Sequence, residues 1–175
     1  MIRFATVEQN LSSVSVSKVR SFVKDWLPAW IWMAVVFSAS ADSASFRHSS
    51  RLLDPLLRWL FPHLSEDRRN FMILLARKGA HLTEYAVLSL LFWRGIRKSS
   101  NHDTPHWSWE QSGRAVLYVA LFAATDELHQ LFVPGRDASV RDVIIDTIGG
   151  ILGILVLKAI LAGWTRFKKI SNSQA

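Results

Sequence analysis

Four mostly apolar segments follow one another along the chain, and each is long enough to form a helix. They cover residues 26–41, 79–93, 115–133 and 143–165. The first contains no charged residue, whereas acidic or basic side chains interrupt the other three. A helix that crosses a bilayer needs about 20 apolar residues, so segment length alone leaves a soluble four-helix bundle open.

The distribution of polar residues within these segments favours a membrane. A soluble amphipathic helix carries polar residues along its whole length. Here each of the last three segments is apolar on all faces over one half and polar over the other half. The stretches without a charged face are Leu88–Trp93, Ala115–Ala124 and Ile148–Leu157. We therefore predict an all-α integral membrane bundle of four transmembrane helices.

The connection between the first two segments has a different character. Residues 51–61 interleave leucines and a tryptophan with charged residues, a pattern that suits a helix lying in the membrane interface. Pro62 is expected to end this helix. Ser65, followed by the acidic residues Glu66 and Asp67, is typical of the start of a new helix that continues into the second segment.

Composition narrows the class of protein further. The 175 residues have a net charge of +7 and include eight tryptophans but no cysteine, which excludes a disulfide scaffold and thiolate metal sites. The positive charge suits nucleic acid or an anionic membrane surface. No nucleic-acid-binding motif is present, and tryptophans lie near segment ends at positions 26, 93 and 164, as at membrane interfaces. We expect membrane lipids, and no nucleic acid, as partners.

The chain accordingly divides into three parts. Residues 1–24 are expected to form a basic polar tail that is partly disordered, residues 25–166 the four-helix membrane domain, and residues 167–175 a polar C-terminal tail. The Lys and Arg bias between the two sides is small and favours cytoplasmic termini, with the chain crossing the membrane several times. Lys158 is expected to reach the interface opposite the polar residues.

The polar residues of the four segments are predicted to meet at one end of the bundle. Short connections make consecutive segments alternate in direction, so the end of one segment lies beside the start of the next. These residues are Ser38, Ser40 and Asp42 in the first segment, Lys78, His81, Glu84 and Tyr85 in the second, Asp126, Glu127, His129 and Gln130 in the third, and Asp142 and Asp146 in the fourth.

Helical spacing then sorts these residues into faces. Lys78, His81 and Tyr85 share one stripe of their helix, whereas Asp142 and Asp146 share a stripe that continues into Gly149-x-x-x-Gly153. Such a glycine pair allows a neighbouring helix to approach closely. Ionisable groups within a membrane are costly to bury, so the cluster indicates a functional site. In the alternative interpretation, Lys78 and Arg136 neutralise Asp126 and Asp142, and the cluster is a structural network that fixes helix packing.

The same residues resemble a known family. The motifs are Arg77-Lys78-x-x-His81-x-x-Glu84-Tyr85-x-x-Leu88, Asp126-Glu127-x-x-Gln130-x-x-x-Pro134-Gly135-Arg136 and Asp142-x-x-x-Asp146-x-x-Gly149. In order and spacing they are similar to the VanZ-like family of small bacterial membrane proteins. The resemblance implies a polytopic inner-membrane protein of the cell envelope with four helices, in a family named for a protein linked to teicoplanin resistance. The family usually has asparagine where this chain has Asp146.

Three function hypotheses follow. In the first, the cluster binds or processes an anionic envelope lipid or lipid-linked cell-wall precursor, with no cofactor. The candidate acid–base residues are His81, Glu84 and Asp126, and the candidate ligand-binding residues are Lys78, Tyr85, Glu127, Gln130, Arg136, Asp142 and Asp146. No metal site is predicted, because the cluster lacks close ligand spacing such as His-x-x-x-His.

The second hypothesis is a non-enzymatic membrane scaffold or interaction protein. The third is a proton-coupled transporter, which requires a homo-oligomer because four helices are too few to enclose a path. Replacement of Lys78 and of His81 by alanine separates binding from acid–base chemistry, since the loss of the cation damages binding most and the loss of the imidazole damages proton transfer at least as much.

Overall fold

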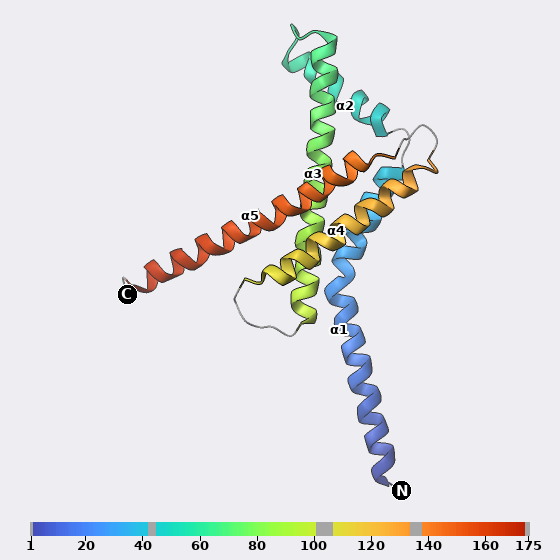
Figure 1. Ribbon diagram of the computed structural model, residues 1–175, viewed down its shortest axis with the longest axis vertical. Coiled ribbons are helices and arrows are strands. Elements are labelled where there is room, and N and C mark those ends of the chain that lie inside the picture. Colours follow the sequence, from blue (N-terminus) through green and yellow to red (C-terminus); the bar gives the residue numbers. More distant parts are fainter. Residues whose placement is uncertain (1, 42–44, 101–106, 134–137, 174–175) are drawn as a thin grey trace.

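The computed structural model describes residues 2–41, 45–100, 107–133 and 138–173 (Figure 1). These residues form helices and no strand. The helices are α1 (Ile2–Ala41), α2 (Ser45–Leu60), α3 (Glu66–Ser99), α4 (Trp109–Gln130) and α5 (Val140–Ser173). The expected all-α class is therefore confirmed.

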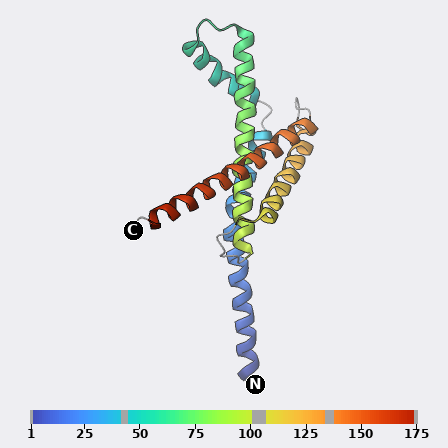
Figure 2. The same cartoon turned by 60° about the vertical axis from the view of Figure 1, so that its left-hand side comes forward.

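Four of the helices pack together with alternating direction (Figures 1 and 2). Helices α1 and α4 run one way, and α3 and α5 run back. Helix α3 lies at the centre and contacts each of the other four helices. The buried core lies where α1, α3, α4 and α5 meet, and its largest members are Tyr85, Leu88, Phe92, Val119, Phe122 and Ile154. The alternation predicted from the short connections is thus present.

The crossing of α5 over α3 is formed by glycines, as the Gly149-x-x-x-Gly153 spacing predicts. A Cβ atom placed on Gly149 would lie 2.6 Å from the carbonyl oxygen of Leu82. One placed on Gly153 would lie 2.6 Å from the carbonyl oxygen of Ala86. Side chains cannot fit into such a contact, so the two backbones touch directly. This contact fixes the height at which the polar start of α5 faces α3.

Helix α2 forms a hairpin with the start of α3, beyond the core of the bundle (Figure 1). Asp54 accepts hydrogen bonds from Arg58 Nε at 2.8 Å and from Arg69 Nε of α3 at 3.1 Å, and Arg69 also donates to the Leu64 carbonyl oxygen at 2.5 Å. The helix predicted within residues 51–61 is confirmed, and it ends just before Pro62.

The start of α3 also matches the prediction. Ser65 occupies the N-cap position, with Glu66 and Asp67 in the first turn of the helix. The Ser65 hydroxyl makes no capping hydrogen bond, so the two acidic side chains near the positive end of the helix dipole are what favours this start electrostatically.

Two expectations differ from the structure. Helix α1 already begins at Ile2, so residues 2–24 are helical where a partly disordered tail was expected. Four spanning helices are not confirmed either. Among the described residues, one helix is long and apolar enough to cross a membrane, over Val140–Asn172 in α5. Charged residues interrupt the apolar stretches of α3 and α4, and the charge-free stretch of α1 covers only residues 26–41.

The exposed surface is nevertheless strongly apolar. Of the most apolar window of α5, 28% is buried, whereas the core helix of a soluble protein would be mostly buried. Large apolar side chains face outward on every packed helix, among them Ile31 and Val35 in α1, Phe71 and Leu75 in α3, Leu117 and Leu121 in α4, and Leu155 and Ile160 in α5. Apolar patches of this extent mark contact with lipid or with other proteins.

Candidate functional site

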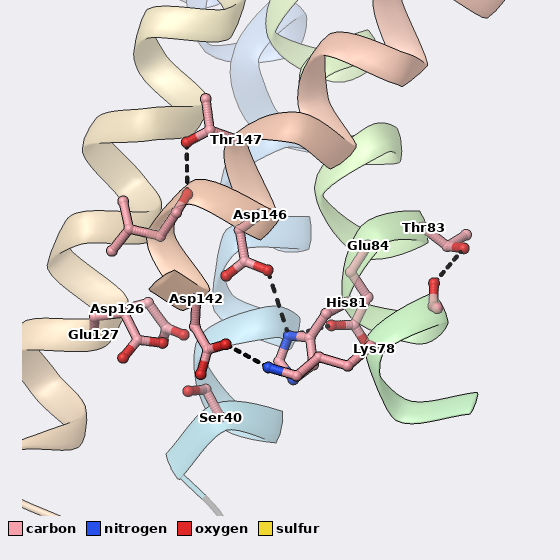
Figure 3. Close-up of polar contacts among 12 residues, drawn as sticks. Ser40, Lys78, His81, Thr83, Glu84, Asp126, Glu127, Asp142, Asp146 and Thr147 are labelled. Atoms are coloured by element: carbon pink, nitrogen blue, oxygen red, sulfur yellow. Dashed lines mark hydrogen bonds and ion pairs between the residues drawn. The ribbon is translucent and has the colours of Figure 1, made fainter. Parts of the chain in front are cut away.

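The polar residues of four helices meet at one end of the core, as predicted (Figure 3). They come from the end of α1, the middle of α3, the end of α4 and the start of α5. Most of the acidic groups are withdrawn from solvent: Asp126 is 1%, Glu127 6% and Asp146 3% exposed. Three carboxylates buried so close together need hydrogen-bond or ionic partners, because an unpaired buried charge is costly.

Helices α3 and α5 are joined by one ion pair and by a contact between a histidine and a carboxylate. The Lys78 ammonium forms a hydrogen-bonded ion pair with the Asp142 carboxylate (Figure 3). His81 Nδ1 lies 3.8 Å from Glu84 Oε2 and 3.9 Å from Asp146 Oδ1. The imidazole is therefore positioned between a carboxylate of its own helix and one of α5.

Helix α4 is tied to α1 and to the start of α5 through amide and carboxylate groups. Gln130 Nε2 donates to Ser40 Oγ of α1 at 2.8 Å, and it also lies 3.4 Å from Asp126 Oδ2 and 3.3 Å from Glu127 Oε1. Glu127 Oε2 accepts a hydrogen bond from the backbone N–H of Ser139 at 2.8 Å, directly before α5. Glu127 thereby links the ends of α4 and α5.

A cavity of about 190 Å³ opens among these groups. Its lining residues are Leu74, Arg77, Lys78, His81, Glu127, Gln130, Asp142, Ile145 and Asp146. The structure therefore brings six of the predicted site residues together around one space.

Three predicted residues lie beside the cavity instead of lining it. Tyr85 is fully buried, and within the described part of the chain its hydroxyl has no hydrogen-bond partner. Asp126 is buried behind Gln130, and its Oδ1 likewise has no partner among the described residues. Glu84 is close to His81 but outside the lining. Arg136 lies outside the described residues, as does Asp42.

The cavity also contains residues that the sequence analysis did not name as site residues. Arg77, Leu74 and Ile145 line it. The signal was present in the spacing, because Leu74 lies four residues before Lys78 and Arg77 four residues before His81, which puts each pair on one face of α3. Ile145 stands three residues after Asp142 for the same reason.

The opposite end of the bundle carries aromatic and cationic side chains. Lys158 Nζ lies 3.9 Å from the ring centroid of Trp109, at the start of α4. Arg97 stacks over Trp93, which itself stacks on Trp107 with ring centroids 6.0 Å apart. Lys158 thus lies at the end of the bundle opposite the cavity, where it was expected.

Within the described residues, no group of three or more histidine, aspartate or glutamate side chains is arranged so that it could hold a metal ion. The cavity is instead lined by a mixture of two fixed cations, Arg77 and Lys78, and three carboxylates.

The described residues form an all-helical bundle with a polar cavity at one end. The VanZ/LLP1 family model matches residues 26–162, and the chain belongs to this family. The matched segment includes every residue that lines the cavity. No curated protein and no solved structure matches the chain significantly. The family is generally membrane-associated, and membership supports a VanZ-like role at the cell envelope.

Proposed function

We propose that this protein crosses the membrane several times and binds, in its polar cavity, the headgroup of an anionic envelope lipid or lipid-linked cell-wall precursor. The observation that carries the proposal is the cavity itself, which opens between a lysine, an arginine and a histidine at one end of a bundle with apolar outer faces. A lipid has the same division between a polar head and apolar chains.

Lys78 and Arg77 are the groups expected to hold a phosphate. An arginine guanidinium presents a planar fork of donors that suits phosphate oxygens, and a lysine ammonium adds a compact charge. Lys78 is paired with Asp142, so the carboxylate orients the ammonium at the cavity wall. The carboxylates deeper in the lining are acceptors for hydroxyl, amide or ammonium groups of the same ligand.

The membrane arrangement rests on the outer surface. The exposed apolar side chains of α1, α3, α4 and α5 are what the hydrocarbon of a bilayer would cover. With the termini in the cytoplasm of a bacterial cell, the cavity faces outward, towards the wall. Sequestration of a wall precursor there would change susceptibility to glycopeptides such as teicoplanin, which is the phenotype that the VanZ-like resemblance implies.

A second candidate function is acid–base chemistry on the bound headgroup. The specific observation is that His81 Nδ1 lies within 4 Å of both Glu84 and Asp146. A carboxylate beside an imidazole helps to orient it as a general acid or base. The acidic residues predicted to act with His81 were Glu84 and Asp126. Among the described contacts this place is taken by Glu84 and Asp146.

Binding to defined nanodiscs tests the proposed function. The full-length protein is titrated with dioleoylphosphatidylglycerol in a phosphatidylcholine background. Lys78→Ala is expected to weaken binding about tenfold or more, because a charged hydrogen bond to phosphate is lost. Lys98→Ala is the matched control, since this lysine also faces an aspartate, Asp25 at 3.5 Å, but lies at the opposite end. Equal affinity of the two variants would refute the proposal.

The same preparation separates binding from catalysis. If the protein only binds, Lys78→Ala weakens affinity more than His81→Ala does. If His81 transfers protons, His81→Ala leaves affinity close to that of the native protein, and it abolishes turnover of a lipid-linked precursor followed by mass spectrometry.

A further inference from the structure

The cavity has a buried side and an exposed side. The buried side is formed by Glu127 and Gln130 of α4 and by Asp146 of α5. Lys78 of α3 and Asp142 of α5 also line the cavity, and their side chains are partly exposed. Among the lining residues, the exposed ones thus come from α3 and α5, so the cavity opens between these two helices.

This opening has aliphatic side chains on both helices. Leu74 of α3 is exposed and Ile145 of α5 is half-buried, and both line the cavity. The apolar outer surface of the bundle therefore reaches the cavity itself. In a bundle surrounded by lipid, such an opening leads sideways into hydrocarbon.

The contacts of the α5 glycines show which flank of this helix is at the opening. Gly149 and Gly153 touch the backbone of α3, whereas a Cβ on Gly150 would come within 2.8 Å of a valine side chain of α4. Successive residues of a helix are rotated by about 100°. Ile148 and Leu152, one residue before the two glycines that touch α3, therefore lie on the flank away from α4. They are 44% and 48% exposed.

An apolar stripe runs along this flank and begins at the cavity. Ile145, Ile148, Leu152 and Leu155 follow one another at helical spacing and share one face of α5, and the last three are exposed. We call these four residues the α5 stripe. Beyond its crossing with α3, α5 extends away from the other helices (Figures 1 and 2). The α5 stripe thus leads from the polar cavity along an open side of the helix.

The length of the α5 stripe is that of one membrane leaflet. Its ends are ten residues apart, which is about 15 Å along a helix. The hydrocarbon core of a bilayer is about 30 Å thick, so each leaflet contributes half of that. A lipid chain that extends from a headgroup to the middle of the bilayer covers the same distance.

We propose that a membrane lipid places its headgroup in the cavity while one of its hydrocarbon chains leaves over Ile145 and lies along the α5 stripe. The inference rests on the proposed function and adds how the ligand enters and what holds its chain. The ligand is then a lipid that stays anchored in the bilayer and moves in sideways between α3 and α5. A lipid chain is the occupant that fits, because the α5 stripe is apolar, one leaflet long and continuous with a polar cavity.

Photo-crosslinking tests where the chain lies. Full-length protein in phosphatidylcholine nanodiscs receives phosphatidylglycerol with a diazirine in its acyl chain, and the labelled residues are mapped by mass spectrometry. We expect labelling of Ile148, Leu152 and Leu155 to exceed that of Leu121, an exposed leucine of α4 that does not line the cavity. A tenfold excess of dioleoylphosphatidylglycerol should lower labelling of the α5 stripe about tenfold by mass action, and leave Leu121 unchanged.

Variants connect the labelled chain to the headgroup site. Lys78→Ala is expected to lower labelling of the α5 stripe about tenfold, the same factor by which it weakens headgroup binding, and to leave labelling of Leu121 unchanged. Lys98→Ala, at the opposite end of the bundle, should preserve both. The competition with unlabelled lipid needs no variant, so it decides the question if Lys78→Ala fails to fold.

The outcomes separate this inference from the proposed function. If the α5 stripe is labelled no more than Leu121 and competitor lipid has no effect, while Lys78→Ala still weakens binding, the path of the chain is refuted and the headgroup site stands. If Lys78→Ala changes neither binding nor labelling, the headgroup site itself is refuted, and the inference falls with it.

Discussion

Gly153 of α5 lies against the backbone of Ala86 in α3, so closely that a Cβ atom on the glycine would come within 2.6 Å of the alanine carbonyl oxygen. The same Cβ would be 2.7 Å from Ser89 Oγ. Because Ala86 contributes backbone atoms to this contact, the neighbour cannot move aside by a rotamer change.

Replacement of Gly153 by alanine is therefore expected to destabilise the fold. The added methyl group must push α5 away from α3, at a cost of about 1–3 kcal/mol. Unfolding in a mixed-micelle denaturant titration measures the change. Gly163→Ala is the control, because a Cβ there meets no atom within 4 Å, and the better helix propensity of alanine should leave stability equal or slightly higher. Equal destabilisation of both variants would show that the backbone contact is absent.

The Lys78–Asp142 pair is expected to contribute little to stability in spite of its position at the site. The two side chains are 39% and 35% exposed, so water screens their attraction. A double-mutant cycle with Lys78→Met and Asp142→Asn should give a coupling energy of no more than about 1 kcal/mol. A much larger coupling would favour the structural interpretation of the cluster, in which this pair holds α3 to α5.

The α2–α3 hairpin is expected to open in acid. Desolvation acts to raise the pKa of Asp54, but hydrogen bonds from Arg58 and Arg69 outweigh it and hold this pKa below its usual value. A carboxylate with a lowered pKa contributes stability above its unfolded-state pKa of about 3.9, and this contribution is lost as the pH falls through the folded-state value.

Spin labels measure this opening directly. The chain contains no cysteine, so labels on single cysteines at Leu56 in α2 and Phe71 in α3 have no background. The distance between them should be constant near neutral pH and increase below about pH 4. Asp54→Asn should show the increased distance at all pH values, whereas Asp67→Asn should behave as the native chain. A distance that does not depend on pH in the native chain would contradict the role of Asp54.

The membrane topology can be tested by labelling single cysteines, because the chain contains no cysteine of its own. Single cysteines replace Ala138, before α5, and Glu110, at the start of α4. With cytoplasmic termini, a membrane-impermeant maleimide added to intact cells should label Ala138→Cys and not Glu110→Cys. The reverse pattern would invert the proposed orientation, and equal labelling of both positions would contradict the multi-pass arrangement.

Much of the site could be predicted from the sequence, because helix periodicity and the alternating direction of the helices decide which residues lie at the same end of the bundle. The stripe of Lys78 and His81, the close approach at Gly149 and the start of α3 after Ser65 all follow from local spacing. Of the two carboxylates beside His81, Glu84 also follows from its spacing on α3, whereas the one from α5 does not, since it depends on how far α5 is rotated against α3. Spacing alone therefore allows either Asp126 or Asp146 to lie beside His81, and the structure has Asp146 there.

The long α1 shows a second limit of the sequence pattern. Serine side chains compete for backbone hydrogen bonds in non-helical conformations, so the serine-rich residues 2–24 were expected to be partly disordered. In the structure they continue the helix that begins the core at Trp26. Helix formation propagates easily once a packed turn exists, because each added residue gains a hydrogen bond without a new nucleus.

The glycine contact between α3 and α5 also bears on how this family can diversify. Because the two backbones touch, the width between these walls of the cavity cannot be adjusted by side chains at the crossing. The aliphatic residues of the cavity lining are Leu74 and Ile145, and they take no part in that contact. The size of the cavity therefore depends on these two side chains. Exchanges between smaller and larger aliphatic residues at these two positions would change the volume of the cavity and leave the helix crossing unchanged.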